Sequence, residues 1–203
     1  ALAILMNADI VVAKSTLSAE EAGHMAALAK MGQIVFFSTA PIIGAMFPII
    51  SERYDKGSKH VHILLRATIL SIVISGIILT FIYIFPKFTV SVLFGSQFAD
   101  TASQLSMMGY AMMAFTIGNL YVSYFLSIRE NRFIILLWIV VLLHIYLLAN
   151  FHDSVHQIVT VDATSFSIMA GSSLIWYLVG KRKRLRQLVH LDERLWRLLF
   201  KGI

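Results

Sequence analysis

A few ionisable side chains interrupt long apolar stretches of the sequence, and they are the first candidates for chemistry. Asp9 is a carboxylate that can bind a cation or a proton, and hydrogen bonding to neighbours such as Asn7 is the structural alternative. Lys30 and Arg66 can bind an anionic group, or can extend their charges to a membrane surface. For Lys30 we prefer the anion-binding interpretation, and for Arg66 the surface anchor. His144 is interpreted as a hydrogen-bonded structural residue.

A second group of candidates carries neutral polar groups. Asn119, Tyr121 and Tyr124 lie in one apolar stretch, and their side chains can hydrogen-bond to sugars or stack on sugar rings. Hydrogen bonds between helices and tyrosines at a membrane interface explain the same residues at least as well. Both interpretations stay open.

The composition defines the setting of these residues. Of the 203 residues, 58% are apolar and only 14% are charged, against about 25% charged in an average soluble domain. This excess excludes a soluble domain and a disordered chain, and the absence of cysteine excludes disulfide scaffolds and cysteine-ligated metals. We predict a polytopic membrane protein, in which the net charge of +6 sets orientation rather than binding nucleic acid.

Apolar runs long enough for membrane helices predict an all-α bundle of about six spans. The first run lacks an initiator Met and a basic leader, so we expect a fragment cut within a helix. Ser18 and Glu21 fit a helix-capping box, and Pro41 predicts a kink or hinge. The predicted spans are 1–13, 19–50, 61–85, 105–128, 133–151 and 163–180, with polar connections that include 86–104 and 152–162.

The basic residues alternate between connections. Segment 51–66 holds four, segment 129–132 holds two and the tail from Lys181 holds eight, so these segments carry fourteen of the 17 Lys and Arg residues. The positive-inside rule then places both chain ends in the cytoplasm. Apolar spacing in 185–200 predicts a basic amphipathic helix on the membrane surface, and a plain orientation signal is the alternative.

Signatures of enzymes are missing from the sequence. There is no Walker A motif, no HExxH, no GxSxG and no glycine-rich dinucleotide turn. His60 and His62 are two residues apart and do not share a helix face, which argues against a metal pair. We therefore expect no catalytic activity, no cofactor and no metal.

Three ordered motifs resemble the polysaccharide flippases, which export lipid-linked oligosaccharides and belong to the multidrug/oligosaccharidyl-lipid/polysaccharide exporter superfamily. The first runs from the intramembrane Asp9 through an acidic-Ala-Gly helix start to a helix with two prolines before Ser-Glu. The second is a Phe-Gly segment, and the third is a helix that bears an asparagine. The motifs are Asn7-Ala-Asp9, Glu21-Ala-Gly23, Pro41, Pro48-Ile-Ile-Ser51-Glu52, Leu93-Phe-Gly95-Ser-Gln-Phe98, Asn119, Ser123 and Ser127-Ile-Arg129.

The resemblance implies the C-terminal lobe (1–180) of a two-lobe flippase, with the N-terminal lobe missing, and a cytoplasmic tail (181–203). It implies movement of an undecaprenyl-diphosphate-linked oligosaccharide across the bacterial inner membrane by alternating access, coupled to a cation or proton at Asp9. Lys30 and Arg66 would bind the diphosphate, while Asn119, Tyr121 and Tyr124 would bind sugar. The expected partners are this substrate, membrane lipids and the missing lobe.

Two other functions stay as alternatives, beside a structural membrane fragment with no transport role. A multidrug or cation antiporter of the same superfamily has a cavity that is usually acidic and aromatic, and the presence of Lys30 beside Asp9 favours an anionic substrate instead. A membrane-embedded transferase of cell-envelope assembly would need an outer loop rich in catalytic groups. The longest predicted outer loop, 86–104, offers only Lys87 and Asp100.

Overall fold

The computed structural model describes residues 1–95, 98 and 101–199, with side chains as far as Gly180. Every long element in these residues is an α-helix, which confirms the predicted all-α bundle. The helices are α1 (Leu2–Thr16), α2 (Ala19–Asp55), α3 (Val61–Ile84), α4 (Pro86–Phe94), α5 (Ala102–Ser127), α6 (Phe133–Asn150) and α7 (Val155–Leu199).

Five of the helices are long and apolar enough to cross a membrane. They are α2, α3, α5, α6 and the Val155–Gly180 part of α7, so the chain is a multi-pass membrane protein. The first predicted span, α1, has 15 residues and is shorter than a full crossing.

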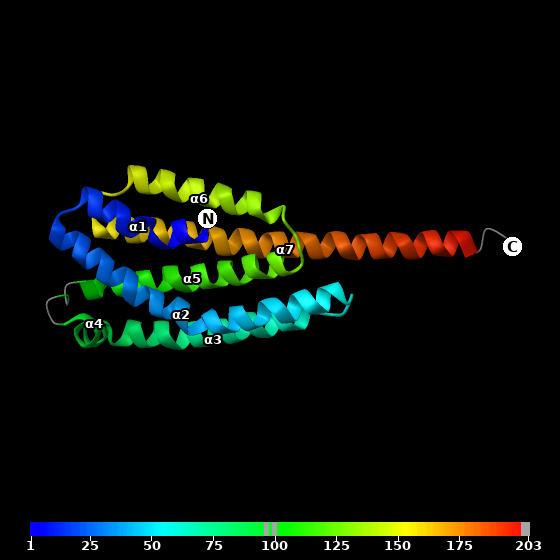
Figure 1. The fold of residues 1–203 in the computed structure, drawn as a ribbon, viewed down its shortest axis with the longest axis horizontal. Coiled ribbons are helices and arrows are strands. Elements are labelled where there is room, and N and C mark those ends of the chain that lie inside the picture. The colour runs from blue at the N-terminus through cyan, green and yellow to red at the C-terminus, as the bar shows by residue number, and fades with distance from the viewer. Residues whose placement is uncertain (96–97, 99–100, 200–203) are drawn as a thin grey trace.

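The bundle is organised around α5 and α7, which pack against each other (Figure 1). Helix α6 lies on one side of this pair, α2 and α3 lie on the other, and α1 contacts α2, α6 and α7. A close approach between helices holds the centre together. A Cβ atom on Gly118 of α5 would clash with Met169 Cε and would lie 3.4 Å from the Ala170 backbone nitrogen of α7. Small residues at such crossings allow tight packing in membranes.

Helix α2 is bent within one continuous helix. It begins at the predicted capping box, in which Ser18 accepts a hydrogen bond from the Glu21 backbone and the Glu21 carboxylate accepts one from the Ser18 backbone. Pro41 and Pro48 lie inside the helix, where each removes a backbone hydrogen bond. In Figure 1 the first half of α2 crosses the bundle obliquely and the second half runs beside α3.

Two segments that were predicted to be polar connections between helices contain helical residues in the structure. Segment 86–104 contains the short helix α4, which starts at Pro86, a residue suited to the first helical position. Segment 152–162 is not a polar loop, because α7 already begins at Val155. Val155, Ile158 and Val159 are buried on one face of that first part of α7.

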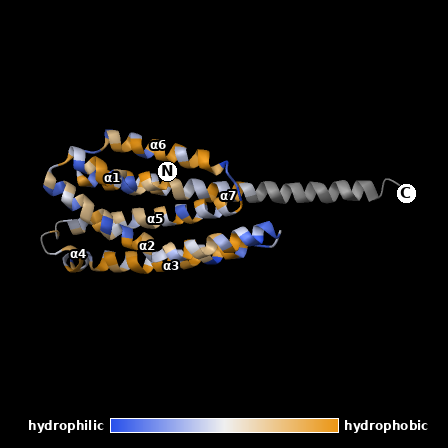
Figure 2. Cartoon of the chain, viewed as in Figure 1, coloured by the Kyte–Doolittle hydropathy of each residue, from blue (hydrophilic) through white to orange (hydrophobic). Residues whose placement is uncertain are grey.

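Polar residues gather at the helix ends and apolar residues cover the shafts (Figure 2). The basic segments 51–66 and 129–132 lie at the same end of the bundle, and α7 runs toward that end (Figure 1). At this end Arg129 of the α5–α6 connection binds Asp55 at the end of α2, with 2.9 Å between Nη2 and Oδ1. The predicted amphipathic tail continues α7 as far as Leu199, and its side chains lie outside the described residues.

Candidate functional site

Two carboxylates meet inside the bundle. Asp9 comes from the middle of α1 and is 1% exposed, and Asp162 comes from α7 and is fully buried. Their carboxyl groups lie side by side, close enough for a proton on one to bond the other. Among the described residues, none of the four carboxylate oxygens has a hydrogen-bond partner.

His144 of α6 completes this buried cluster. Its Nε2 atom lies 3.9 Å from Asp162 Oδ1, and both side chains are fully buried. This distance is too long for a hydrogen bond, and both ring nitrogens lack a partner in the described part of the chain. The ring stacks on Phe166 of α7, with 5.7 Å between centroids. The packing therefore fixes the orientation of the imidazole.

The cluster needs a positive charge in order to be stable as a buried site. Charged carboxylates are costly away from water, and two adjacent negative charges repel each other. A shared proton, or a small cation between the carboxylates, removes both costs. No group of three or more His, Cys, Asp or Glu in the residues described is arranged to hold a metal ion.

Asp162 was missed as a site residue, because segment 152–162 was interpreted as a loop. A periodic signal was present in the sequence. Residues 155, 158, 159, 162, 166 and 169 recur at helical spacing, and all six are buried on one face of α7. The pattern places a carboxylate in the middle of an apolar stripe.

Lys30 is linked to α1 through a glutamine. Its Nζ donates to Gln33 Oε1 over 3.1 Å, and Gln33 Nε2 donates to the backbone oxygen of Met6 over 3.4 Å. Gln33 is buried, whereas Lys30 is exposed on the surface of the described bundle. The charge of Lys30 acts on Asp9. The structure therefore brings these two predicted residues into one region and adds Gln33 to them.

The predicted sugar-binding tyrosines are packed inside the bundle. The Tyr121 and Tyr124 rings each make an edge contact with Tyr177 of α7 at 5.7 Å. The Tyr124 hydroxyl lies 3.3 Å from His60 Nε2 and so joins α5 to the α2–α3 connection. Asn119, one turn earlier in α5, is half-buried. Contact of these residues with sugar stays a prediction.

Arg66 and Pro41 lie away from the carboxylates, on a groove of about 600 Å³ between α2 and α3. Arg53 and His62 line the same groove near Arg66. The two predicted diphosphate-binding cations, Lys30 and Arg66, are therefore in different regions of this lobe. The predicted hinge residue, Pro41, lies inside α2, and its movement stays a prediction.

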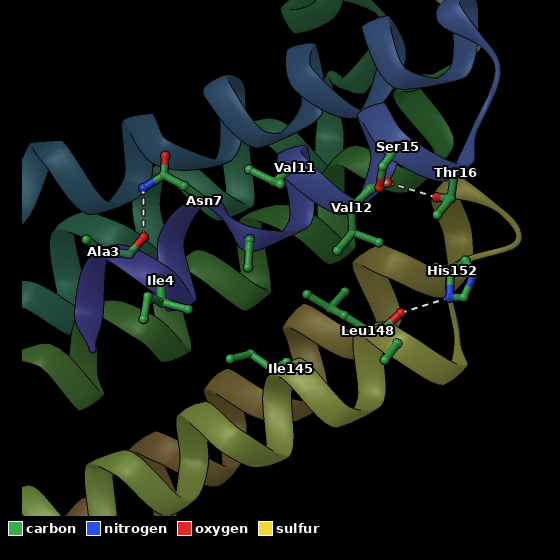
Figure 3. A pocket seen from close by; sticks show the side chains of 12 residues that line it. Ala3, Ile4, Asn7, Val11, Val12, Ser15, Thr16, Ile145, Leu148 and His152 are labelled. Carbon is green, nitrogen blue, oxygen red and sulfur yellow. Dashed lines mark hydrogen bonds between the residues drawn. The ribbon is translucent and has the colours of Figure 1, made fainter.

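A second groove, of about 580 Å³, lies between α1 and α6 (Figure 3). Its walls are apolar, with Ile4, Val11 and Ile145 among them, and Ser15, Thr16 and His152 gather at one end. Ser15 and Thr16 both donate to the Val12 carbonyl of α1, and His152 Nδ1 lies 3.0 Å from the Leu148 carbonyl of α6. Helix α1 thus presents an apolar face to the groove and the carboxylate of Asp9 to the interior.

Comparison with known proteins gives no assignment, because no protein-family model, curated protein or solved structure matches this chain.

Proposed function

We propose that this chain is the C-terminal transmembrane lobe of a flippase that moves an undecaprenyl-diphosphate-linked oligosaccharide across the bacterial inner membrane. The resemblance of the motifs in residues 7–132 supports the family. The observation that carries a transport function is the buried carboxylate pair, Asp9 and Asp162, inside a bundle of membrane helices. Ionisable groups are rare at such positions because they are costly, and they mark pathways for ions and protons.

In this proposal the pair binds a proton that drives transport. Asp9 and Asp162 share the proton in one conformation of the protein and release it in another. His144 holds the α6 side of the site, within one proton transfer of Asp162 once the 3.9 Å gap shortens. Because the pair joins α1 to α7, gaining or losing the proton changes the free energy of the contact between these helices, which is what alternating access requires.

Lys30 supplies the cation for the diphosphate. It is exposed on the bundle, so it can face a cavity shared with another lobe, and the hydrogen bond to Gln33 positions it. Its charge also acts on Asp9. Binding of an anionic headgroup at Lys30 would reduce the influence of that charge on the carboxylate, which links substrate to proton.

The proposed orientation follows from the basic connections. Segments 51–66 and 129–132 share one end of the bundle, and that end is the cytoplasmic one by the positive-inside rule. The C-terminus is then cytoplasmic. The connection that contains α4 and the one that joins α6 to α7 face the opposite side.

A multidrug or cation antiporter of the same superfamily remains the second candidate. The buried carboxylate pair favours it, since such a pair suits a cationic substrate as well as a proton. The two functions differ in the predicted role of Lys30, which an anionic substrate needs and a cationic drug does not.

The test uses the full-length protein in vesicles that contain a fluorescent undecaprenyl-diphosphate oligosaccharide. We expect an imposed pH gradient to drive the lipid to the other leaflet, and we expect D9N and D162N to abolish this movement. D153N is the matched control, because Asp153 is exposed in the α6–α7 connection. Drug efflux without movement of the lipid would establish the antiporter instead.

A further inference from the structure

The α2–α3 groove is a second candidate site, independent of the carboxylates. It lies between the second half of α2 and the first half of α3 and has a volume of about 600 Å³. One part of its lining is apolar and includes Pro41, Ala45, Ile49 and Leu70. The other part carries Arg53, His62 and Arg66, which are all exposed.

The way the two helices align makes one end of the groove apolar and the other end basic. On α2 the lining residues 41, 45, 49 and 53 recur every four positions, so they share a face. On α3 the residues 62, 66 and 70 do the same. Arg53 is close to the end of α2 and His62 is at the start of α3, so both stripes become basic at the same end of the groove.

The length of the groove matches one leaflet of a bilayer. Twelve residues separate Pro41 from Arg53, which is about 18 Å along a helix. Half of the hydrocarbon core of a bilayer is about 15 Å. The groove from Pro41 to Arg53 is therefore about as long as one leaflet. Its apolar part, about 12 Å from Pro41 to Ile49, would lie along an acyl chain, with the basic residues at the level of the phosphate groups.

The arginines at the basic end of the groove form no salt bridge among the described residues. The two nearby carboxylates at the end of α2 are each bound elsewhere, Glu52 to Lys56 and Asp55 to Arg129. Arg53 Nη1 donates to the backbone oxygen of Lys59 over 3.4 Å and lies 3.3 Å from His62 Nε2. Neither Arg53 nor Arg66 forms a salt bridge within the part of the chain that the structure describes, although the charge of Arg53 stabilises the neighbouring Glu52 carboxylate.

We propose that the α2–α3 groove binds an anionic phospholipid, with the phosphate on Arg53, His62 and Arg66 and one acyl chain along the apolar stripe. Basic pockets between membrane helices on the positively charged side are suited to acidic headgroups. The lipid would come from the leaflet at the basic end of the bundle, the cytoplasmic one in the proposed orientation. This site does not depend on the transport activity.

Native mass spectrometry of the purified full-length protein can test the proposal with phosphatidylglycerol and phosphatidylcholine as probes. We expect bound phosphatidylglycerol to exceed phosphatidylcholine, and the double variant R53Q/R66Q to lower its affinity about tenfold, since each basic residue attracts an acidic lipid. R53K/R66K should retain most of the binding. The matched control K14Q/K87Q removes two exposed charges outside the groove and should bind as the unmodified protein does.

The apolar stripe has its own test. A45W fills the α2–α3 groove and should displace phosphatidylglycerol, whereas A149W fills the α1–α6 groove and should not. Thermal unfolding of both variants, matched to the unmodified protein, shows that the fold is intact. The proposal is overturned by unchanged binding in R53Q/R66Q, by equal binding of phosphatidylcholine, by equal losses in either control, or by full competition from soluble glycerol phosphate or from a polyprenyl phosphate.

Discussion

His144 Nε2 and Asp162 Oδ1 face each other across 3.9 Å inside the bundle, with both side chains fully buried and neither hydrogen-bonded within the described residues. A buried acid next to an imidazole, without a bond between them, is a polar contact left incomplete. In a tightly packed protein such a contact usually has a functional reason.

The carboxylate pair predicts an unusual combination of effects on stability and activity. Replacing Asp162 by Asn removes one buried charge and provides an amide that can donate to Asp9. We expect D162N to keep or raise the free energy of unfolding, by about 1 kcal/mol, while transport falls to background. Thermal unfolding in detergent and the vesicle assay measure the two effects. A strongly destabilised D162N would show that the pair is needed for folding.

The two carboxylates should act as one unit. Because they share a single proton in the proposed mechanism, the effects of D9N and D162N on the free energy of unfolding should not add up in the double variant D9N/D162N. Thermal unfolding of the three variants in the same detergent makes this a double-mutant cycle. Additive effects would separate the roles of Asp9 and Asp162.

Two substitutions can separate the packing role of His144 from its role in proton transfer. H144F keeps an aromatic ring against Phe166, so we expect normal folding and reduced proton-driven transport. H144A leaves a cavity and should lower the free energy of unfolding by about 2–4 kcal/mol. Melting temperatures and transport rates of both variants are the readouts. Normal transport in H144F would leave the histidine with packing alone.

Lys30 is the residue that distinguishes an anionic substrate from a cationic one. We expect K30A to insert into the membrane normally and to block export of the lipid-linked glycan, with partial recovery in K30R. K14A removes an exposed lysine at the end of α1 and serves as the control. Surface glycan and membrane-inserted protein are measured in the same cells. Normal export in K30A would remove Lys30 from the site.

Because α5 and α7 approach each other closely at Gly118, even a small side chain at this position should lower the stability of the bundle. G118V would bring a side chain against Met169 and the Ala170 backbone, and we expect it to destabilise the bundle by about 1–3 kcal/mol. G171V is the control, because a Cβ atom at Gly171 meets no other atom within 4 Å. Equal melting temperatures of the two variants would contradict the packing that the structure shows.

The apolar runs predicted most helix positions because they are long and because local signals mark their ends. The capping box of Ser18 and Glu21 located the start of α2, and α6 ends within one residue of its predicted end. The start of α7 was missed because His156, Gln157 and Thr160 made the segment look like a loop. These polar residues lie on the outer side of the helix, opposite the buried stripe.

The site could be predicted only in part. Asp9 stands out in the sequence as a carboxylate in an apolar run, but its partner Asp162 comes from the last helix, and no local pattern relates the two. The packing of Tyr121 and Tyr124 against Tyr177 likewise depends on how α5 meets α7. Such contacts between distant segments are set by tertiary structure, which single-residue patterns do not contain.

The corner between α1 and α2 constrains any movement of the site. Only Leu17 and Ser18 separate the two helices, and the reciprocal Ser18–Glu21 hydrogen bonds close that corner. The distance between Asp9 on α1 and Lys30 on α2 should therefore stay nearly constant when the protein moves. Sliding of α1 along α2 would stretch the corner, whereas tilting the pair together leaves it intact. The proton-binding and anion-binding groups should then travel as one rigid hairpin.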